Sequence, residues 1–191
     1  ETISSYTVAL DGTNVLMQPG DTLCARTVTL TKASNIGPLD QVATMAFPET
    51  GDRFTENTRF TSNRTLTNSL NFVYAFMHCN QNALTQWRAW LTPTNVLDGA
   101  FVSDDSSMGL YKDVRALALF GPAHGKGLLY VYPEVYCGDP AISDGSFLWD
   151  RVNDNKLYFR PDLPSTNDTV GAVSEYEVTL IPFQAEATGW K

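Results

Sequence analysis

Polar and apolar positions alternate along several segments of the chain, and this period of two is the pattern of a β-strand. Threonine occupies every second position from Thr27 to Thr31, with Val28 and Leu30 between these threonines. Successive side chains of a strand point to opposite faces of its sheet, so such a segment has one polar and one apolar face. No long stretch carries apolar positions at helical spacing between a capping residue and a glycine. The sequence therefore predicts a protein built of strands and loops, with helices at most minor.

About nine segments are expected to form strands, since β-branched and aromatic residues fill them and turn residues bound them. They are residues 3–10, 22–31, 69–79, 85–91, 113–120, 128–136, 146–149, 156–160 and 174–183. Residue pairs typical of turns stand between or beside these segments, including Asp11-Gly12, Gly37-Pro38, Asp98-Gly99 and Gly121-Pro122. The spacing of the turns predicts hairpins and longer crossovers.

Three segments between the expected strands are long, at residues 32–68, 92–112 and 161–173. Long loops in a compact domain are usually either functional or mobile. The first of these segments also has room for short strands at residues 41–47 and 58–62. We therefore expect long loops, with some hidden strand structure in the first.

Two segments, residues 70–77 and 128–132, are apolar on both faces and are expected to be central strands covered on both sides. Such strands among half-polar ones fit an all-β fold, either an antiparallel barrel or a two-sheet sandwich of jelly-roll or Greek-key type. A chain of 191 residues can form one all-β domain with a sizeable core. We expect a single domain spanning residues 1–191. Its predicted interior residues are Phe72, Tyr74, Phe76, Leu129, Val131 and Val178.

The net charge of −8 argues against a nucleic-acid partner, because binding to a phosphate backbone requires many Lys and Arg side chains. The 13 basic residues are scattered, and no apolar run is long enough to suggest a membrane span. We expect a soluble protein without membrane insertion. The chain starts at Glu1 without an initiator Met, which suggests a domain excised from a longer precursor or the removal of a signal peptide.

Histidine is the natural starting point of a search for catalysis, and the chain has only 2 histidines. His78 ends the most apolar strand, where a hydrogen-bonded structural role is expected. His124 lies in the glycine-rich segment 121–127, which lacks the spacing and the Ser or Thr of a phosphate-binding loop and is expected to be a turn. No nucleophile elbow occurs, and segment 150–155 lacks the alternating ligands of a calcium loop. The sequence predicts no enzymatic activity, no cofactor and no metal.

The 3 cysteines match no zinc or redox spacing. Cys24 and Cys79 lie in expected strands and are predicted to be buried thiols, whereas Cys137 is predicted to be the more exposed one. Asn63 and Asn167 begin glycosylation sequons in expected loops. Whether either asparagine carries a glycan depends on the compartment in which the protein is made.

Several features of the chain combine into a family resemblance. The threonine-rich strands, the long loops and the acidic balance occur together with the segments Met17-Gln18-Pro19-Gly20-Asp21-Thr22-Leu23 and Glu175-Tyr176-Glu177-Val178-Thr179-Leu180-Ile181-Pro182-Phe183. Over its whole length the chain thereby resembles the projecting spike domains of capsid proteins from small non-enveloped RNA viruses, most of all the astrovirus capsid spike and its avian form. The resemblance implies a spike domain excised from a capsid precursor and exposed on the virion surface. It also implies attachment to a host receptor or glycan, recognition by antibodies, and a homodimer.

A secreted, lectin-like carbohydrate-binding β-sandwich module is the alternative, because such modules share this strand and turn pattern. A candidate ligand surface is formed by two loops that flank the expected strand at 113–120. Its residues are Asp104, Asp105, Ser106, Lys112, His124 and Lys126. Their polar groups can bond sugar hydroxyls, and Lys126 can meet a carboxylated sugar. Trp87 and Trp90 stand three residues apart, so one is expected in the core and the other on the surface, available to a sugar or partner.

Overall fold

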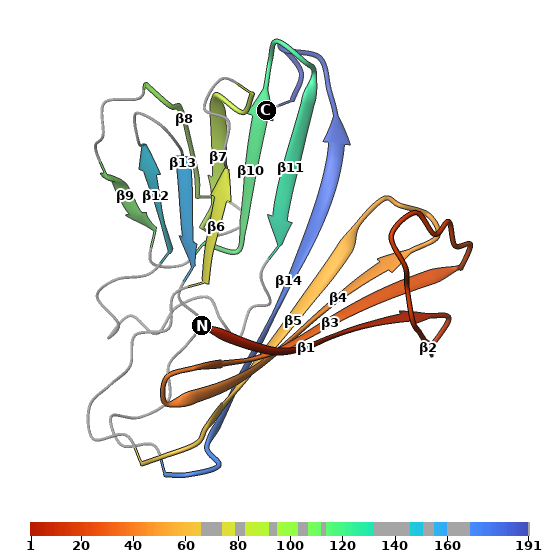
Figure 1. Cartoon of the computed structure of the whole chain (residues 1–191). Coiled ribbons are helices and arrows are strands. Elements are labelled where there is room, and N and C mark those ends of the chain that lie inside the picture. The colour runs from red at the N-terminus through yellow and green to blue at the C-terminus, as the bar shows by residue number, and fades with distance from the viewer. Residues whose placement is uncertain are drawn as a thin grey trace. The chain divides into compact units, whose positions relative to one another are not determined.

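The protein is an all-β protein, as the alternating pattern predicts. The computed structural model describes residues 1–65, 74–78, 83–91, 95–102, 107–111, 114–131, 146–150, 155–159 and 169–190. All helical or extended secondary structure in these ranges consists of β-strands (Figure 1), and the strands pair antiparallel. Within the same ranges, no helix has the length and apolarity needed to cross a membrane.

The chain divides into two compact units, which are considered separately. The first comprises Glu1–Leu70 and Pro164–Thr179, and the second comprises Asn71–Leu163 and Leu180–Lys191. The last strand, β14 (Val173–Gln184), begins in the first unit and ends in the second. The single domain expected for residues 1–191 stays a prediction.

The first unit contains the part of a 10-stranded sheet that has the strand order β2-β1-β3-β4-β5-β14. The strands that precede β14 are β1 (Thr2–Leu10), β2 (Thr13–Val15), β3 (Thr27–Ile36), β4 (Leu39–Pro48) and β5 (Phe54–Ser62). The predicted strands at 41–47 and 58–62 are confirmed as parts of β4 and β5, and both are longer than expected. A two-residue turn at Gly37-Pro38, with φ +62° at Gly37, closes the β3–β4 hairpin. Residues 32–62 are therefore largely sheet, so the long loop expected there was wrong apart from its two hidden strands.

One face of β5, in the first unit's sheet, is buried. Every second residue of β5, from Glu56 through Thr58 and Phe60 to Ser62, is buried. The Phe60 ring lies 6.1 Å from the ring of Tyr176 on β14, and the Thr58 hydroxyl donates to Glu56 Oε1 over 3.3 Å. Desolvation raises the pKa of the Tyr176 hydroxyl. This core is accordingly half polar, which the sequence pattern did not predict.

The second unit contains the remaining strands, arranged in two sheets. The bounds are β6 (Tyr74–His78), β7 (Gln86–Trp90), β8 (Val96–Ala100), β9 (Ser107–Tyr111), β10 (Ala116–Gly121), β11 (Lys126–Val131), β12 (Ser146–Asp150) and β13 (Asn155–Phe159). The strand orders are β14-β11-β10-β7-β8, which is the rest of the 10-stranded sheet, and β6-β13-β12-β9, which is a 4-stranded sheet. The Val102 N–H, just after β8, donates over 2.6 Å to the buried carboxylate of Asp150 on β12 and so joins the two sheets. The two-sheet form of the predicted fold is therefore the one observed.

The interior of the second unit is mostly apolar, as the sequence pattern predicts, although it also includes the buried Asp150. Its buried side chains include Trp87, Ala89, Leu117, Leu119, Phe120, Tyr130 and Leu180. Of the predicted interior residues, Val178 is confirmed in the first unit, with an exposed fraction of 0%. Leu129 and Val131 are only half-buried, because they share the face of β11 opposite to Tyr130. Phe72 lies outside the described residues, as do the side chains of Tyr74 and Phe76.

Two expected central strands have different positions in the sheets. β11 is central, between β14 and β10, as predicted. β6 is the first strand in the described order of its sheet, next to β13, and residues 70–73 of the predicted strand lie outside the described residues, so its central position stays a prediction. Residues 92–112, expected to be a loop, contain β8 and β9.

Two local predictions were wrong for identifiable reasons. Asp98-Gly99 lies within β8 and forms no turn, because glycine is needed there for packing: a Cβ on Gly99 would lie 2.7 Å from Cζ2 of Trp87. Cys24 is exposed and precedes β3. The Asp11 carboxylate accepts the N–H groups of Arg26 and Thr27, each over 2.9 Å, just where β3 begins. Cys79 and Cys137 lie outside the described residues.

Candidate functional site

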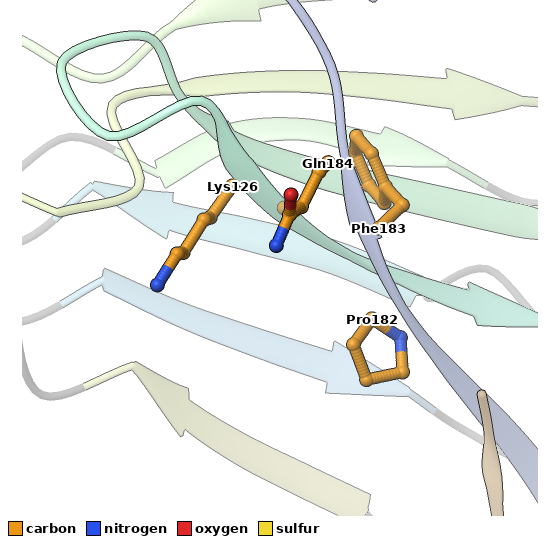
Figure 2. Close-up of a pocket in the computed structure, with 5 residues that line it drawn as sticks. Lys126, Pro182, Phe183 and Gln184 are labelled. Atoms are coloured by element: carbon orange, nitrogen blue, oxygen red, sulfur yellow. The ribbon is translucent and has the colours of Figure 1, made fainter. Parts of the chain in front are cut away.

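A pocket of about 310 Å³ lies at the end of β14, beside the start of β11 in the second unit. It is lined by Lys126, Gly127, Pro182, Phe183 and Gln184. Figure 2 shows Lys126 and Gln184 extending from neighbouring strands on the same side of the β14 ribbon, with Pro182 farther along that side. The ring of Phe183 lies on the other side of β14, as expected for successive residues of a strand.

The turn between β10 and β11 positions the Lys126 side of the pocket. The His124 N–H donates to the Gly121 carbonyl over 3.0 Å, and Gly125 adopts φ +60°, a conformation that favours glycine. The Ala185 N–H donates to the Gly125 carbonyl over 3.1 Å. The end of β14 is thereby fastened to the turn, which keeps the residues of the two strands together.

Close packing behind the pocket depends on Gly127. A Cβ built on Gly127 would lie 2.1 Å from Cζ of Phe183, so the phenyl ring occupies the space that a side chain would need. Phe183 stacks on the buried ring of Phe120, with ring centroids 6.0 Å apart. The ring of Trp190 stacks on Phe120 at 4.8 Å, and its indole N–H donates to Gln86 Oε1 over 2.8 Å. This aromatic cluster gives the pocket a rigid support.

The polar groups of the pocket are an ammonium and an amide. Lys126 and Gln184 are both exposed. No ion pair joins Lys126 to a carboxylate in the described part of the chain, whereas Lys32 pairs with Glu1 at 2.7 Å and Arg88 with Asp98 at 3.9 Å. An ammonium only donates hydrogen bonds, and an amide both donates and accepts them. The pocket can therefore bind hydroxyl and carboxylate oxygens.

The structure places part of the predicted ligand surface at this pocket. Lys126 lines it, and the exposed His124 lies in the adjoining turn, which confirms the turn predicted for the glycine-rich segment 121–127. The other predicted site residues lie outside the described residues: Asp104, Asp105, Ser106 and Lys112.

Sequence reasoning missed the contribution of β14 to the pocket. Pro182, Phe183 and Gln184 stand at the end of the alternating run that closes the chain, far in sequence from Lys126. Their alternation identified a strand, but its pairing with β11 was needed to bring them to the lysine. Within the described residues, no group of three or more His, Cys, Asp or Glu side chains is arranged to hold a metal ion.

The tryptophan pair on β7 fits its prediction. Trp87 is 7% exposed and belongs to the core, while Trp90 is half-buried. The Arg88 guanidinium lies 5.5 Å from the centre of the Trp90 ring, so it covers part of the surface offered to a ligand. Asn63 of the first sequon is exposed, and Asn167 of the second lies outside the described residues.

Comparison with known proteins identifies the fold but no family. No protein-family model matches the chain, and no curated protein matches it. Among solved structures, the chain is similar to the galactosidase domain of the α-galactosidase-sucrose kinase AgaSK, with 11% identity and a TM-score of 0.60 over 96% of this chain and 28% of that one. It is also similar to the GH36 α-galactosidase AgaA from Geobacillus stearothermophilus, with 15% identity and a TM-score of 0.53 over 95% of this chain and 30% of that one. The chain thus spans less than a third of either structure, and at these identities the likeness shows a β-sandwich fold alone.

Proposed function

We propose that the protein is a non-catalytic β-sandwich domain that binds carbohydrate at the pocket formed by Lys126, Gly127, Pro182, Phe183 and Gln184. The observation that carries this proposal is the combination of an ammonium and an amide with an exposed proline ring on two adjoining strands. A sugar presents hydroxyls at its rim and C–H groups on its faces. Hydrogen bonds from Lys126 and Gln184 suit the hydroxyls, and Pro182 suits an apolar sugar face.

The structural likenesses support a carbohydrate ligand by association. The two similar structures carry the names of galactosidases, although the chain spans only 28% and 30% of them. A shared sandwich fold can carry unrelated functions. The likeness alone therefore does not identify a ligand. It adds to the expectation of a carbohydrate, for which the pocket supplies the chemical reason.

The pocket chemistry favours binding over hydrolysis. Most glycoside hydrolases use a pair of Asp or Glu side chains that flank the scissile bond. The described lining of the pocket contains neither residue type. Lys126 and Gln184 can orient a sugar, but they do not form a general acid and base pair of this kind.

The finer form of the proposal comes from the resemblance to capsid spikes. In that form, the domain projects from a virion, binds a host-cell glycan or receptor, is recognised by antibodies and acts as a homodimer. A symmetric dimer would present two copies of the pocket, so attachment to a cell surface would gain from avidity. In the alternative form, the domain is a secreted module that binds carbohydrate in the same way but is not part of a virion.

Binding to a glycan array tests the proposal. We expect the wild-type protein to bind a defined set of glycans and the Lys126→Ala/Gln184→Ala double variant to lose most of this signal. Both positions are exposed, so folding should change little, and the matched control Lys32→Ala/Gln18→Ala alters exposed or half-exposed residues of the first unit. Failure of the wild-type protein to bind any glycan, or full binding by the double variant, contradicts the proposed site.

Two further measurements test the viral form. Light scattering should give a dimer at micromolar concentrations, and the isolated domain should compete with intact virus for attachment to susceptible cells. A monomer mass would contradict the dimer, and undiminished virus attachment would contradict the attachment role, while either leaves carbohydrate binding to be judged by the array.

A further inference from the structure

We infer that the pocket selects carboxylated sugars, with the ligand carboxylate bound by the Lys126 ammonium and the Gln184 amide. This inference rests on the proposed function and gives it a chemical class of ligand. It follows from the charge, the neighbours and the strand register of Lys126.

Lys126 is available to an external anion. No described carboxylate pairs with it, in contrast to Lys32 and Arg88, which each have an acidic partner. Its register partner across the β10–β11 hairpin is Gly121, which has no side chain that could cover the lysine. Gly121 is fixed in this role, because a Cβ there would collide with the carbonyl group of Ala83. The backbone of Ala83, and no side chain of residue 121, therefore lies on this flank of the hairpin, and it brings no acidic group to Lys126.

Gln184 completes an arrangement suited to a carboxylate. The pocket places it beside Lys126 in Figure 2, and its amide N–H₂ can donate to one carboxylate oxygen while the ammonium donates to the other. Hydrogen bonds from an ammonium to a carboxylate are charge-assisted and stronger than those to a neutral hydroxyl. A neutral sugar offers the ammonium only hydroxyl oxygens, which form weaker hydrogen bonds with it. The pocket should accordingly distinguish sugars that differ only by the carboxylate.

The acidic character of the whole protein limits this preference without cancelling it. The net charge is −8, and the exposed Glu186 stands two residues after Gln184. At physiological ionic strength, interactions between exposed charges fade beyond a Debye length of about 8 Å, so nearby groups dominate the field at the pocket. The expected preference is therefore moderate and should decrease as salt is added.

Titration with matched sugar pairs, followed by protein NMR, tests the inference. The probes are methyl β-glucuronide against methyl β-glucoside, and methyl α-galacturonide against methyl α-galactoside, because each pair exchanges a carboxylate for a hydroxymethyl group. We expect the wild-type protein to bind the acidic member of at least one pair about tenfold more tightly. The Lys126→Gln variant should lose this preference, and Lys126→Arg should keep most of it. Lys32→Gln removes the same charge from the first unit and should behave like the wild type.

The outcomes separate this inference from the proposed function. Equal binding of acidic and neutral members shows a carbohydrate site without acid selectivity, which overturns the inference alone. An acid preference that survives in Lys126→Gln places the selectivity elsewhere and also overturns it. Failure of all four probes overturns the inference, and the glycan array then decides whether the proposed function stands.

Discussion

The phenyl ring of Phe183 occupies the space above Gly127, where a Cβ would lie only 2.1 Å from Cζ of the ring. This contact joins β14 to β11 at the pocket and places Gln184, the next residue on β14, beside Lys126, the residue before Gly127. Because Gly127 has no side chain, Phe183 can pack against β11, and this packing helps to hold Gln184 beside Lys126 in the pocket.

Replacing Gly127 by alanine should destabilise the second unit. The added methyl group must displace Phe183 or shift the strand, and overpacking of this kind costs about 1–3 kcal/mol. Chemical denaturation measures the loss, and Gly189→Ala is the matched control because its Cβ would meet no atom within 4 Å. Equal stability of the two variants would show that Phe183 does not rest on Gly127.

Trp190 should stabilise the aromatic cluster behind the pocket through two separable interactions. Trp190→Ala removes both the stack on Phe120 and the hydrogen bond to Gln86 and should cost about 1–3 kcal/mol. Trp190→Phe keeps an aromatic ring and loses the N–H donor, for about 1 kcal/mol. Thermal melts of the two variants measure the difference. If alanine leaves the melting temperature unchanged, the terminal segment does not pack on Phe120 in solution.

The alternating pattern was sufficient to predict the fold class and most strands. It was insufficient where a side chain interacts beyond its own strand. Gly99 suggested a turn, but it lies in β8 because Trp87 fills the space beside it. Cys24 continued an alternating run, yet β3 begins only at Thr27, where the distant Asp11 carboxylate accepts two N–H groups.

The candidate site was predictable in part for the same reason. Lys126 was identified from its place in a glycine-rich turn, which is local information. Its neighbours Pro182 and Gln184 are brought to it by strand pairing, which depends on the whole fold. Long-range pairing of this kind is the information that alternation in a single sequence does not contain.

Leu180 should be among the residues that contribute most to stability. Its exposed fraction is 0%, so Leu180→Ala should leave a cavity and cost about 2–5 kcal/mol. Leu16 is 89% exposed, and Leu16→Ala should change stability by less than about 0.5 kcal/mol. Urea denaturation measures both. A small loss for Leu180→Ala would mean that β14 does not enter the core as described.

Stability should fall at alkaline pH because of Tyr176. Desolvation, with a smaller contribution from Glu56, raises the pKa of its hydroxyl above the ordinary value of 10.0. Above pH 10 the unfolded chain releases this proton while the folded chain keeps it, so the free energy of unfolding decreases as pH rises further and is unaffected well below pH 10. Tyr176→Phe should weaken this decline. Unfolding titrations between neutral pH and pH 11 measure it, and identical profiles for the two proteins would contradict a buried hydroxyl.

The most direct test of carbohydrate binding at the pocket is an NMR titration of the wild-type protein with the glycan that gives the strongest array signal. The account predicts saturable shifts of the backbone amide signals of Gly127, Phe183 and Gln184, while the signal of Thr44 in the first unit stays unchanged. Shifts confined to the first unit, or a bound glycan that leaves these three pocket signals unmoved, would contradict it.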